Sequence, residues 1–537
     1  MKKILALLTV LMLMATAAFA EGAETGTDTQ EAGESAAMEM TTLPDMPDEN
    51  GGTPPEKPEG DMGTPPERPE GDMGTPPEKP EGDMGTPPEK PEGDMGTPPE
   101  KPEGDMGTPP EMPGDGNGMG TPPGGFGGNT APGESADSIE YSAAQEISEA
   151  AEITGLTCSS ETADESALLI STEEAVSLKD LTVSKTGDSD GGDSCNFYGL
   201  NAAVLVMGGS TTTISGAQIT SDADGANGVF GYGGNGGRNG VEGDGTTVVI
   251  SDSTITTTGD GSGGIMTTGG GVTYATNLTV ETSGRSSAAI RTDRGGGTVV
   301  VEGGIYTSSG LGSPAIYSTA DITVTGASLT SNLSEGVCIE GKNSITLVDC
   351  ELTANNTQLN GNATFLDTIM IYQSMSGDAD SGTSAFTMTG GSLTSLNGHM
   401  FHVTNTNAVI TLSGVNLINE GSDVLLSVCS DGWHGAGNVA TLNADAQALA
   451  GTLLVGEDAS LTLNLTNGST FEGTVSGEIY NAKGEEVSTA AGTVNVVLDE
   501  TSTWILTADT YITSFEGSLE NVIGDYALYV NGVQVNE

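Results

Sequence analysis

Aromatic side chains are scarce in this chain of 537 residues, where Phe, Tyr and Trp make up 4% of the positions while glycine occupies 81. A hydrophobic core of this composition cannot depend on large rings. It must be built from aliphatic side chains repeated in a regular lattice, which favours a solenoid over a compact globule.

Positive charge is equally scarce. Fifteen Lys and Arg residues stand against 75 Asp and Glu residues, so the formal net charge is -60. A chain this acidic repels nucleic acid and anionic membrane surfaces, and we expect neither as a partner. The charge favours solubility, cation binding, and ligands that are neutral or bridged by cations.

Long apolar runs are confined to the N-terminus. Residues 4–14 form an apolar run after Lys2 and Lys3, and Ala18-Phe19-Ala20 follows before Glu21. This pattern predicts a secretory signal peptide in residues 1–20 and an exported mature chain. No later run approaches the roughly 20 apolar residues of a membrane-spanning helix, so we expect no integral membrane segment in the mature chain.

Cysteine is limited to five residues, which cannot all pair within one chain and which show no Cys-x-x-Cys metal spacing. Cys158 and Cys195 are placed where a bridge near the start of the folded part is conceivable, but the sequence leaves their state open, as it does for Cys338 and Cys429. Cys350 occupies a slot that other repeats fill with Ala or Ser, which predicts a buried small residue.

Residues 21–137 are acidic and contain an 11-residue repeat, Thr-Pro-Pro-Glu-Lys-Pro-Glu-Gly-Asp-Met-Gly, which opens at Thr53 and recurs four times from Thr64 to Thr97. Three prolines per repeat forbid helix and sheet and favour polyproline II. We predict a disordered Pro/Gly-rich segment, either a spacer that holds the next domain away from the secreting cell or an inert linker.

The rest of the chain repeats one pattern, first seen in Ile214 to Ser221: an aliphatic residue, a few small or polar residues, a second aliphatic residue, then Thr or Ser. The base step between copies is near 24 residues, as in stacked repeats. The first aliphatic positions are Ile214, Ile250, Val324, Leu347, Met388 and Leu412. The second are Ile219, Ile255, Leu278, Ile305, Leu329, Leu352, Leu393 and Leu417.

Each repeat contains three short strand signals separated by Gly, Ser, Asn and Asp, which fits one turn of a parallel β-helix with columns of aliphatic residues inside. We therefore expect an all-β fold with a cap and first coils in residues 138–200 and the β-helix in residues 201–430. Residues 431–537 should form wider coils and a cap, because their pattern recurs at an offset of 33. Loops should leave the solenoid at 230–245 and 355–367.

Several segments carry a family resemblance. These are Asn201 to Val206, Ser287 to Gly297, Ser313 to Ser318 and Thr503 to Thr507. They resemble the adhesin-like right-handed β-helix proteins that anaerobic bacteria and archaea export, which have the pectin-lyase-like fold. The resemblance covers roughly residues 166–532 and implies a secreted or surface-exposed protein that engages glycans.

Enzymes of the pectin-lyase-like fold provide a test for catalysis. The polygalacturonase group uses Asn-Thr-Asp, Asp-Asp, Gly-His-Gly and Arg-Ile-Lys motifs, and this sequence contains none of them. Hydrolysis of a glycosidic bond needs two carboxylates spaced across it, whereas the acidic residues here are scattered. His434, in Trp433-His434-Gly435, is best interpreted as a loop or structural histidine.

The main local anomaly is a cluster of three arginines, Arg285, Arg291 and Arg294, in a region with few basic residues. An Arg can bind a carboxylate through two parallel hydrogen bonds, which suits uronate or sialic groups. The alternatives are that the arginines pair with neighbouring acids to stiffen the stack, or that one removes a proton in a lyase reaction.

A second candidate surface follows from aligning the third strands on Ile290, Ile316 and Ile339. That alignment places Arg291, Tyr317 and Glu340 in one outward-facing column. Such a column either binds a sugar chain or is a plain solvent-facing ladder.

Two acidic loops share the form Asp-x-Asp-Gly-x-[Asp/Asn], and alternate carboxylates with a glycine turn suit Ca²⁺. Neither has the bidentate Glu that completes an EF-hand loop, so acidic turns without metal are the alternative. The candidate calcium ligands are Asp188, Asp190, Asp193, Asp222, Asp224 and Asn227.

The sequence thus predicts a right-handed parallel β-helix behind a signal peptide and a disordered acidic segment. Its leading functional interpretation is a non-catalytic, adhesin-like protein that contacts polysaccharide or host and cell-surface glycans. A divergent polysaccharide lyase and a structural envelope component remain as alternatives.

Overall fold

The computed structural model describes residues 139–536, whose regular elements are almost all β-strands. The signal peptide predicted in residues 1–20 and the disordered acidic segment predicted in residues 21–137 lie outside the described residues. Three long sheets account for most of the strands, and every pairing within them is parallel.

The first sheet has 15 strands. They are β1 (Ser142–Ile147), β4 (Glu165–Ser171), β7 (Val204–Met207), β10 (Val229–Tyr232), β13 (Ile265–Thr268), β16 (Ile290–Thr292), β19 (Ile316–Ser318), β22 (Val337–Glu340), β25 (Asp367–Tyr372), β28 (His399–Thr404), β31 (Val424–Val428), β33 (Ala448–Val455), β35 (Thr470–Ser476), β39 (Thr503–Leu506) and β42 (Val522–Ile523).

The second sheet has 14 strands. They are β2 (Ala151–Thr154), β5 (Ala175–Lys179), β8 (Thr211–Ser215), β11 (Thr247–Ser251), β14 (Gly271–Thr276), β17 (Gly297–Glu302), β20 (Asp321–Thr325), β23 (Ser344–Val348), β26 (Thr383–Thr389), β29 (Asn407–Ser413), β32 (Asn438–Asp445), β34 (Ala459–Thr466), β38 (Thr493–Leu498) and β41 (Ser514–Glu516).

The third sheet has 10 strands. They are β3 (Thr157–Ser160), β6 (Thr182–Lys185), β9 (Gln218–Ser221), β12 (Thr254–Thr257), β15 (Thr279–Thr282), β18 (Ile305–Ser308), β21 (Ser328–Ser331), β24 (Glu351–Asn355), β27 (Ser392–Asn397) and β30 (Asn416–Asn419).

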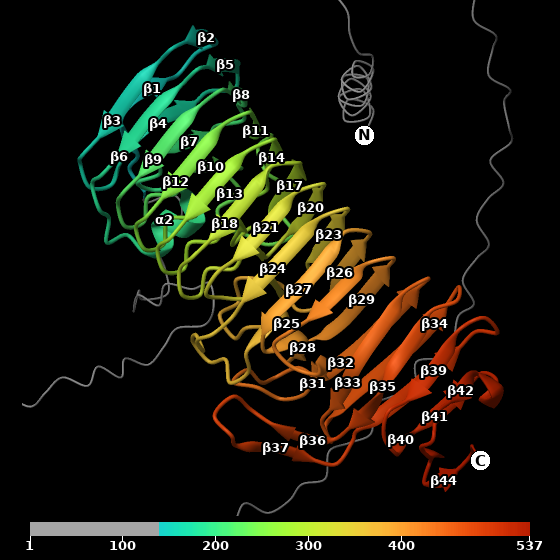
Figure 1. Ribbon diagram of the computed structural model, residues 1–537. Helices are drawn as coiled ribbons and strands as arrows, with labels where there is room; N and C mark the ends of the chain where they lie inside the picture. Colours follow the sequence, from blue (N-terminus) through green and yellow to red (C-terminus); the bar gives the residue numbers. More distant parts are fainter. Residues whose placement is uncertain (1–138, 537) are drawn as a thin grey trace, which may run out of the picture. The chain divides into compact units, whose positions relative to one another are not determined.

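Up to β30, consecutive strands pass from the first sheet to the second and then to the third, so three strands make one coil and each sheet takes every third strand. This confirms the predicted right-handed parallel β-helix, whose coils follow one another in chain order in Figure 1. The described residues begin with the strand β1, which pairs with β4.

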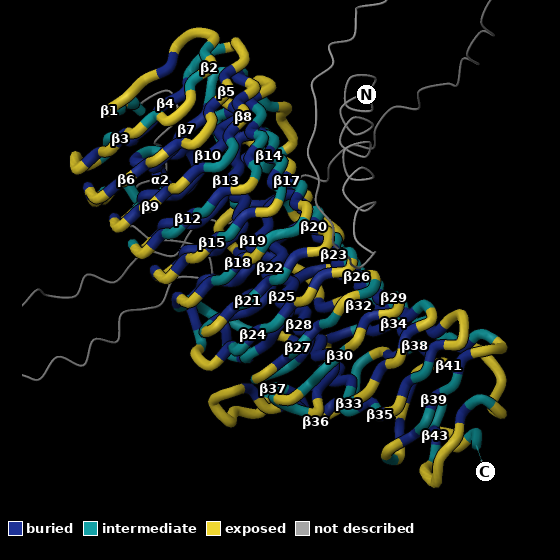
Figure 2. The backbone as a smooth tube through the Cα atoms, turned by 45° about the horizontal axis from the view of Figure 1, so that its top comes forward, coloured by how far each residue is buried: buried dark blue, intermediate teal, exposed yellow. Residues whose placement is uncertain are grey.

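The inward columns confirm the lattice expected from the repeats. Ile214 pairs with Ile250, and the column continues through Val324, Leu347, Met388 and Leu412, all of them buried. Figure 2 shows the alternation of buried and more exposed residues along the strands. Cys350 is fully buried, as predicted for its slot, and all five cysteines are buried free thiols.

The second column departs from the prediction at two positions. Val280 pairs with Ile255, and Tyr306 pairs with Val280 and Leu329, so neither Leu278 nor Ile305 occupies the expected slot. Ile305 is 53% exposed, whereas the Tyr306 ring is fully buried. The turn at Gly303 and Gly304 has the same length as those before β15 and β21, so Ile305 takes the outward slot that Thr279 and Ser328 fill, and Tyr306 takes the inward slot.

The C-terminal coils lose one side of the solenoid. The third sheet ends at β30, while the first and second sheets continue, so the coils there have two main strands instead of three. The offset of 33 is confirmed in the pairing of Leu461 with Val494 and of Phe471 with Trp504. The Gln447 side-chain amide covers part of the exposed edge by accepting from the Val415 N–H at 2.7 Å and donating to its carbonyl at 2.9 Å.

Two small sheets complete the C-terminal part. The hairpin formed by β36 (Glu478–Tyr480) and β37 (Glu486–Thr489) is antiparallel. The other sheet contains β40 (Thr510–Ile512), β43 (Leu528–Val530) and β44 (Val533–Gln534), and the short 3-10 helix η2 (Leu519–Asn521) precedes β42.

Several segments cover the outer face of the first sheet, among them residues 429–437, where Trp433 packs near Tyr372, and the hairpin of β36 and β37, where Ile479 packs near Phe365. The expected loops correspond to residues 233–246 and 356–366, whereas the helix α2 (Asp193–Tyr198) and the insertion 373–382 were not predicted. Aromatic side chains form small cores beneath these segments, as where Phe197 and Tyr198 pack near Phe230. None of the helices in residues 139–536 combines the length and the apolarity that crossing a membrane requires.

Glycines at the turn from the third sheet to the first provide a test of the stacking. A Cβ at Gly310 would lie 1.7 Å from the Gly284 carbonyl oxygen, and a Cβ at Gly284 would lie 1.8 Å from that of Gly259. We expect Gly310→Ala to lower the free energy of unfolding by about 1–3 kcal/mol, the range for overpacking. Gly437→Ala is the matched control, because its Cβ would meet nothing closer than 3.7 Å. Urea denaturation of the two variants measures the difference, and equal midpoints would contradict the stacking argument.

Candidate ligand groove and the buried network beside it

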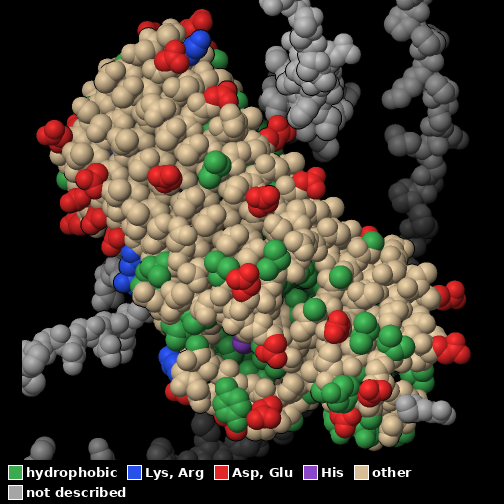
Figure 3. Space-filling model, in the orientation of Figure 1, with side chains coloured by type: hydrophobic (Ala, Val, Ile, Leu, Met, Phe, Trp, Pro, Cys, Tyr) green, Lys and Arg blue, Asp and Glu red, His purple; other side chains and the backbone are tan. Residues whose placement is uncertain are grey.

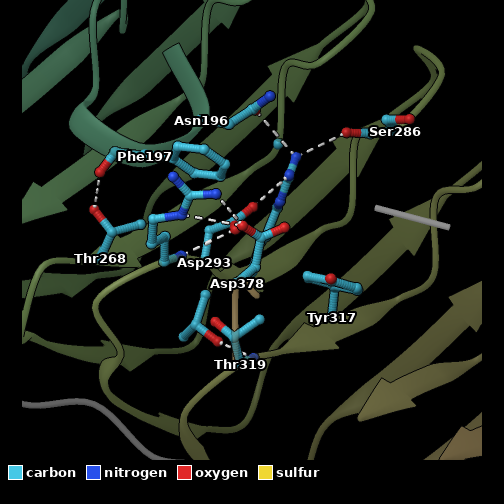
Figure 4. A network of polar contacts seen from close by, with 12 residues as sticks. Asn196, Phe197, Thr268, Ser286, Asp293, Tyr317, Thr319 and Asp378 are labelled. Atoms are coloured by element: carbon cyan, nitrogen blue, oxygen red, sulfur yellow. Dashed lines mark hydrogen bonds and ion pairs between the residues drawn. The ribbon is translucent and has the colours of Figure 1, made fainter. Parts of the chain in front are cut away.

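The structure separates the three arginines along β16 and its flanking turns. Arg285 is exposed in the turn before the strand, and its guanidinium is 3.4 Å from Asn360 Oδ1. Arg291 lies within β16 and is 1% exposed, while Arg294 follows the strand and is about one-third exposed. Only Arg291 and Arg294 join one network: Asp293, labelled in Figure 4, accepts from the Arg291 guanidinium and from the Arg294 backbone N–H.

Arg291 is held by the protein itself. Its guanidinium forms a buried ion pair with Asp293 at 2.6 Å and donates to Asn196 Oδ1 at 3.2 Å and to the Ser286 carbonyl at 3.0 Å. Burial raises the pKa of the Asp293 carboxyl, and the adjacent Arg291 charge opposes that rise. These contacts agree with the alternative in which the arginines pair with neighbouring acids and stiffen the stack.

Arg294 joins two of the covering segments. Its guanidinium lies 4.2 Å from the centroid of the Phe197 ring in α2 and forms an ion pair with Asp378 in the insertion 373–382. Nε donates to Asp378 Oδ1 at 3.0 Å. Cation–π and charge-assisted contacts of this kind are directional, so Arg294 fixes how both segments lie on the sheet.

The predicted column is wrong at Glu340. Arg291 pairs with Tyr317 as expected, but Tyr317 pairs with Cys338, so Glu340 lies two residues further along its strand. The alignment on Ile339 failed because the turn before β22 is shorter than those before β16 and β19. Moreover, Arg291, Tyr317 and Glu340 are at most 3% exposed, because the insertions cover them, so they form no open sugar-binding face.

Glu340 nevertheless meets Tyr317 through its side chain. The Tyr317 hydroxyl donates to Glu340 Oε2 at 2.6 Å, the Tyr372 hydroxyl donates to the same oxygen at 3.1 Å, and Ser374 donates to Oε1. Burial raises the pKa of the Glu340 carboxyl, and these hydrogen bonds oppose the rise. The contacts attach the insertion 373–382 to the sheet.

An open groove lies beside this network, where the first sheet turns into the second. Its volume is about 420 Å³. Its floor contains Gly270, Gly295 and Gly296, all in the left-handed backbone region. Asn239 lies in one wall, where its amide accepts from the Gly295 N–H at 3.1 Å and donates to the Asp378 carbonyl at 3.2 Å. The wall is therefore tied to the same insertion that Arg294 holds.

The polar residues of the groove come from four different segments. Glu242 belongs to the loop 233–246, Asp321 begins β20, Lys342 precedes β23, and Asp380 belongs to the insertion 373–382. Lys342 and Asp380 form a partly exposed ion pair at 2.7 Å. These residues were not predicted as a site, because they are far apart in the sequence and only the fold brings them together.

The acidic loops act as staples between coils. Asp188 Oδ1 accepts the Asp224 N–H at 2.9 Å, and Asp224 Oδ1 accepts the Asp260 N–H at 2.8 Å. Asn227 is buried, and its Oδ1 accepts the Gly263 N–H at 2.8 Å. Asp222 accepts from the Thr258 hydroxyl, Asp190 is exposed, and Asp193 begins α2.

These residues do not converge on a calcium site. Within residues 139–536, no group of three or more His, Cys, Asp or Glu side chains is close enough to hold a metal ion. Asp222 to Asn227 is one copy of a turn that recurs after Thr257, Thr282 and Ser308, with Gly and Ser in matching positions. Aligning those copies is the signal that identifies the motif as a turn.

A buried serine, histidine and aspartate cluster was also missed. The Ser427 hydroxyl lies 2.8 Å from His402 Nδ1, and His402 Nε2 lies 3.4 Å from Asp431 Oδ2. Nucleophilic catalysis needs an accessible hydroxyl, whereas Ser427 and His402 are fully buried and the Phe365 ring stacks on His402 at 4.6 Å. In this conformation the three side chains are therefore structural. His434 is exposed, in agreement with the loop interpretation.

Comparison with known proteins concerns the acidic segment. A family model described as Mucin-like matches residues 26–124, which is less than half of the chain and lies outside the described residues. The match agrees with a secreted or surface protein. No curated protein and no solved structure matches the chain.

The arginines allow a direct test of the pairing interpretation. Arg291→Met leaves the buried Asp293 carboxylate without its partner, so we expect a loss of about 3–5 kcal/mol in the free energy of unfolding. Arg285→Met removes an exposed side chain and should stay within about 0.5 kcal/mol of the parent chain. Urea denaturation compares the two variants. Similar losses would contradict a structural role confined to Arg291.

A buried carboxyl group predicts a pH-dependent stability. Asp367 is 1% exposed, and its Oδ1 has no hydrogen-bond partner among the described residues. Burial raises the pKa of Asp367 well above its ordinary value, and the charges of Glu335 and Asp431 add to the rise. The folded state therefore keeps a proton that the unfolded chain releases above about pH 4, so the free energy of unfolding falls as pH rises.

We expect Asp367→Asn to reduce this fall, which amounts to about 1.4 kcal/mol for each pH unit over which one proton is retained. Denaturation midpoints between about pH 7 and 8.5 measure the fall, because this range lies above the ordinary pKa of histidine. Burial lowers the pKa of His399 to about 3, which makes stability rise with pH only below its ordinary value of 6.5. Asp525→Asn, at an exposed site, should keep the parent slope. An unchanged slope in Asp367→Asn would contradict the assignment.

Proposed function

We propose that the protein is an exported, non-catalytic, adhesin-like β-helix protein that contacts glycans of a host or cell-wall surface. The observation that carries the proposal is the open polar groove at the turn between the first and second sheets. Buried contacts attach its walls to a rigid solenoid, and such preorganisation lowers the entropic cost of binding.

Four carboxyl groups are too deeply buried to act on a glycosidic bond. Retaining and inverting glycosidases both use two carboxyl groups that reach opposite sides of one glycosidic bond. In this protein Asp293, Glu335, Glu340 and Asp367 are each at most 2% exposed. All four lie beneath the covering segments. Asp293, Glu335 and Glu340 also form hydrogen bonds with side chains of the protein.

The charge of the chain supports a surface location in contact with water. Acidic side chains are scattered over the face seen in Figure 3, and basic ones are few. Such a surface stays soluble and resists nonspecific attachment to anionic lipid. The Mucin-like match in residues 26–124 supports the same location. We infer that residues 1–20 direct export and that residues 21–137 separate the β-helix from the site of attachment.

A glycan array together with a turnover assay tests the proposal. We expect the full-length mature chain to bind a subset of immobilised neutral, amino and acidic oligosaccharides without releasing reducing ends or unsaturated products. Because single-site glycan contacts are weak, we expect dissociation constants in the micromolar to millimolar range. These correspond to binding free energies of about -8 to -4 kcal/mol. Release of unsaturated products by the folded chain would overturn the non-catalytic proposal in favour of a lyase. If the chain shows neither binding nor turnover, the result favours a structural envelope component.

A further inference from the structure

The groove has a chemical bias that narrows its ligand. Its lining carries three carboxyl groups, from Glu242, Asp321 and Asp380, against one ammonium group, from Lys342. Because Lys342 is already paired with Asp380, the charges of Glu242 and Asp321 are not balanced within the lining. Such a site attracts a cation and repels uronate, sialate, sulfate or phosphate groups.

The floor of the groove is built for close approach to backbone. A Cβ at Gly295 would lie 2.6 Å from Asn235 Oδ1, and one at Gly270 would lie 2.5 Å from the Gly243 nitrogen. Glycine is therefore required by the packing as well as by the left-handed backbone conformation. These two close approaches pack the loop 233–246 against the turns, whereas a Cβ at Gly296 would meet nothing within 4 Å, so the groove is open over Gly296.

A buried hydroxyl gives an independent indication of a ligand. Thr319 lines the groove, is 4% exposed, and has no hydrogen-bond partner for its Oγ1 among the described residues. Its N–H donates to Thr292 Oγ1 at 2.9 Å, which fixes the backbone at this point next to the network of Figure 4. Buried hydroxyl groups without a partner are uncommon, because leaving one unpaired costs free energy.

We propose that this groove binds a hexosamine residue with a free amino group, as part of an amino-sugar oligosaccharide. The ammonium group of the sugar would lie near Glu242 and Asp321, its hydroxyl groups would supply partners for the polar lining, and its ring would lie over the glycine floor. This assignment rests on the proposed glycan-binding function and adds the site and the ligand class.

The test measures binding of the full-length mature chain to three hexasaccharides by calorimetry. These are a β-linked glucosamine hexamer, its fully N-acetylated form and an oligogalacturonate, at a pH where the glucosamine amino groups are charged. We expect the glucosamine hexamer to bind at least tenfold more tightly than the N-acetylated form, and the oligogalacturonate to bind most weakly. A lysine hexamer serves as a competitor that carries charge without sugar rings.

Two pairs of variants locate the binding. Thr298 is an exposed residue in the groove, so Thr298→Trp should fill the space and reduce affinity at least tenfold, whereas Thr325→Trp, exposed on β20 outside the lining, should not. Asp321→Asn should weaken binding of the glucosamine hexamer at least fivefold. Glu302→Gln removes an exposed carboxylate outside the lining and should leave binding unchanged.

The outcomes separate this inference from the proposed function. Preferred binding of oligogalacturonate, or glucosamine binding that Thr298→Trp leaves intact, overturns the groove assignment while glycan binding stands. Equal binding of the lysine hexamer also overturns it, because the groove would then recognise charge alone. Failure of every oligosaccharide to bind, with circular dichroism showing a folded chain, overturns both.

Discussion

Each coil must place its strands in hydrogen-bonding register with the coil before it, and the other features of this protein depend on that stacking. Parallel strands lie about 4.8 Å apart, so a residue at one slot meets the residue at the same slot of both neighbouring coils. An aliphatic slot therefore becomes a column, as from Ile214 to Leu412. A glycine slot becomes a column as well, because Gly284 and Gly310 approach the carbonyls of the preceding coil too closely for a Cβ.

The same stacking turns polar residues into staples. Asp188 and Asp224 each accept a backbone N–H from the next coil. Ser262 and Ser287 do likewise at buried positions, where each hydroxyl accepts an N–H from the preceding coil. A backbone donor that turns away from the ladder still needs a partner, and a short side chain at a repeated slot supplies one. Many Asp, Ser and Thr residues in the turns are thus explained by the scaffold alone.

The covering segments are held in place by contacts between buried charged and polar side chains. They bury Arg291, Asp293 and Glu340 over the outer face of the first sheet, where each charge needs a partner because burial removes its hydration. Arg291 finds Asp293, and Glu340 finds two tyrosine hydroxyl groups. Arg294 is less buried and holds Asp378, which positions one insertion and, through Asn239, the wall of the groove. The buried network is therefore the support of the groove.

The sequence by itself determined the coil, because the size and polarity of residues alternate with a local period that any short stretch displays. The three strands of each coil, the aliphatic columns and the burial of Cys350 were predicted on this basis. The prediction failed at Glu340, where a turn is shorter, and at Ile305, where an apolar residue occupies an outward slot and Tyr306 fills the inward one. The tertiary structure alone decided that Arg291 is buried and that Glu242, Asp321 and Lys342 share a groove. Those facts depend on how insertions distant in sequence fold back onto the sheet, and no local period records that contact.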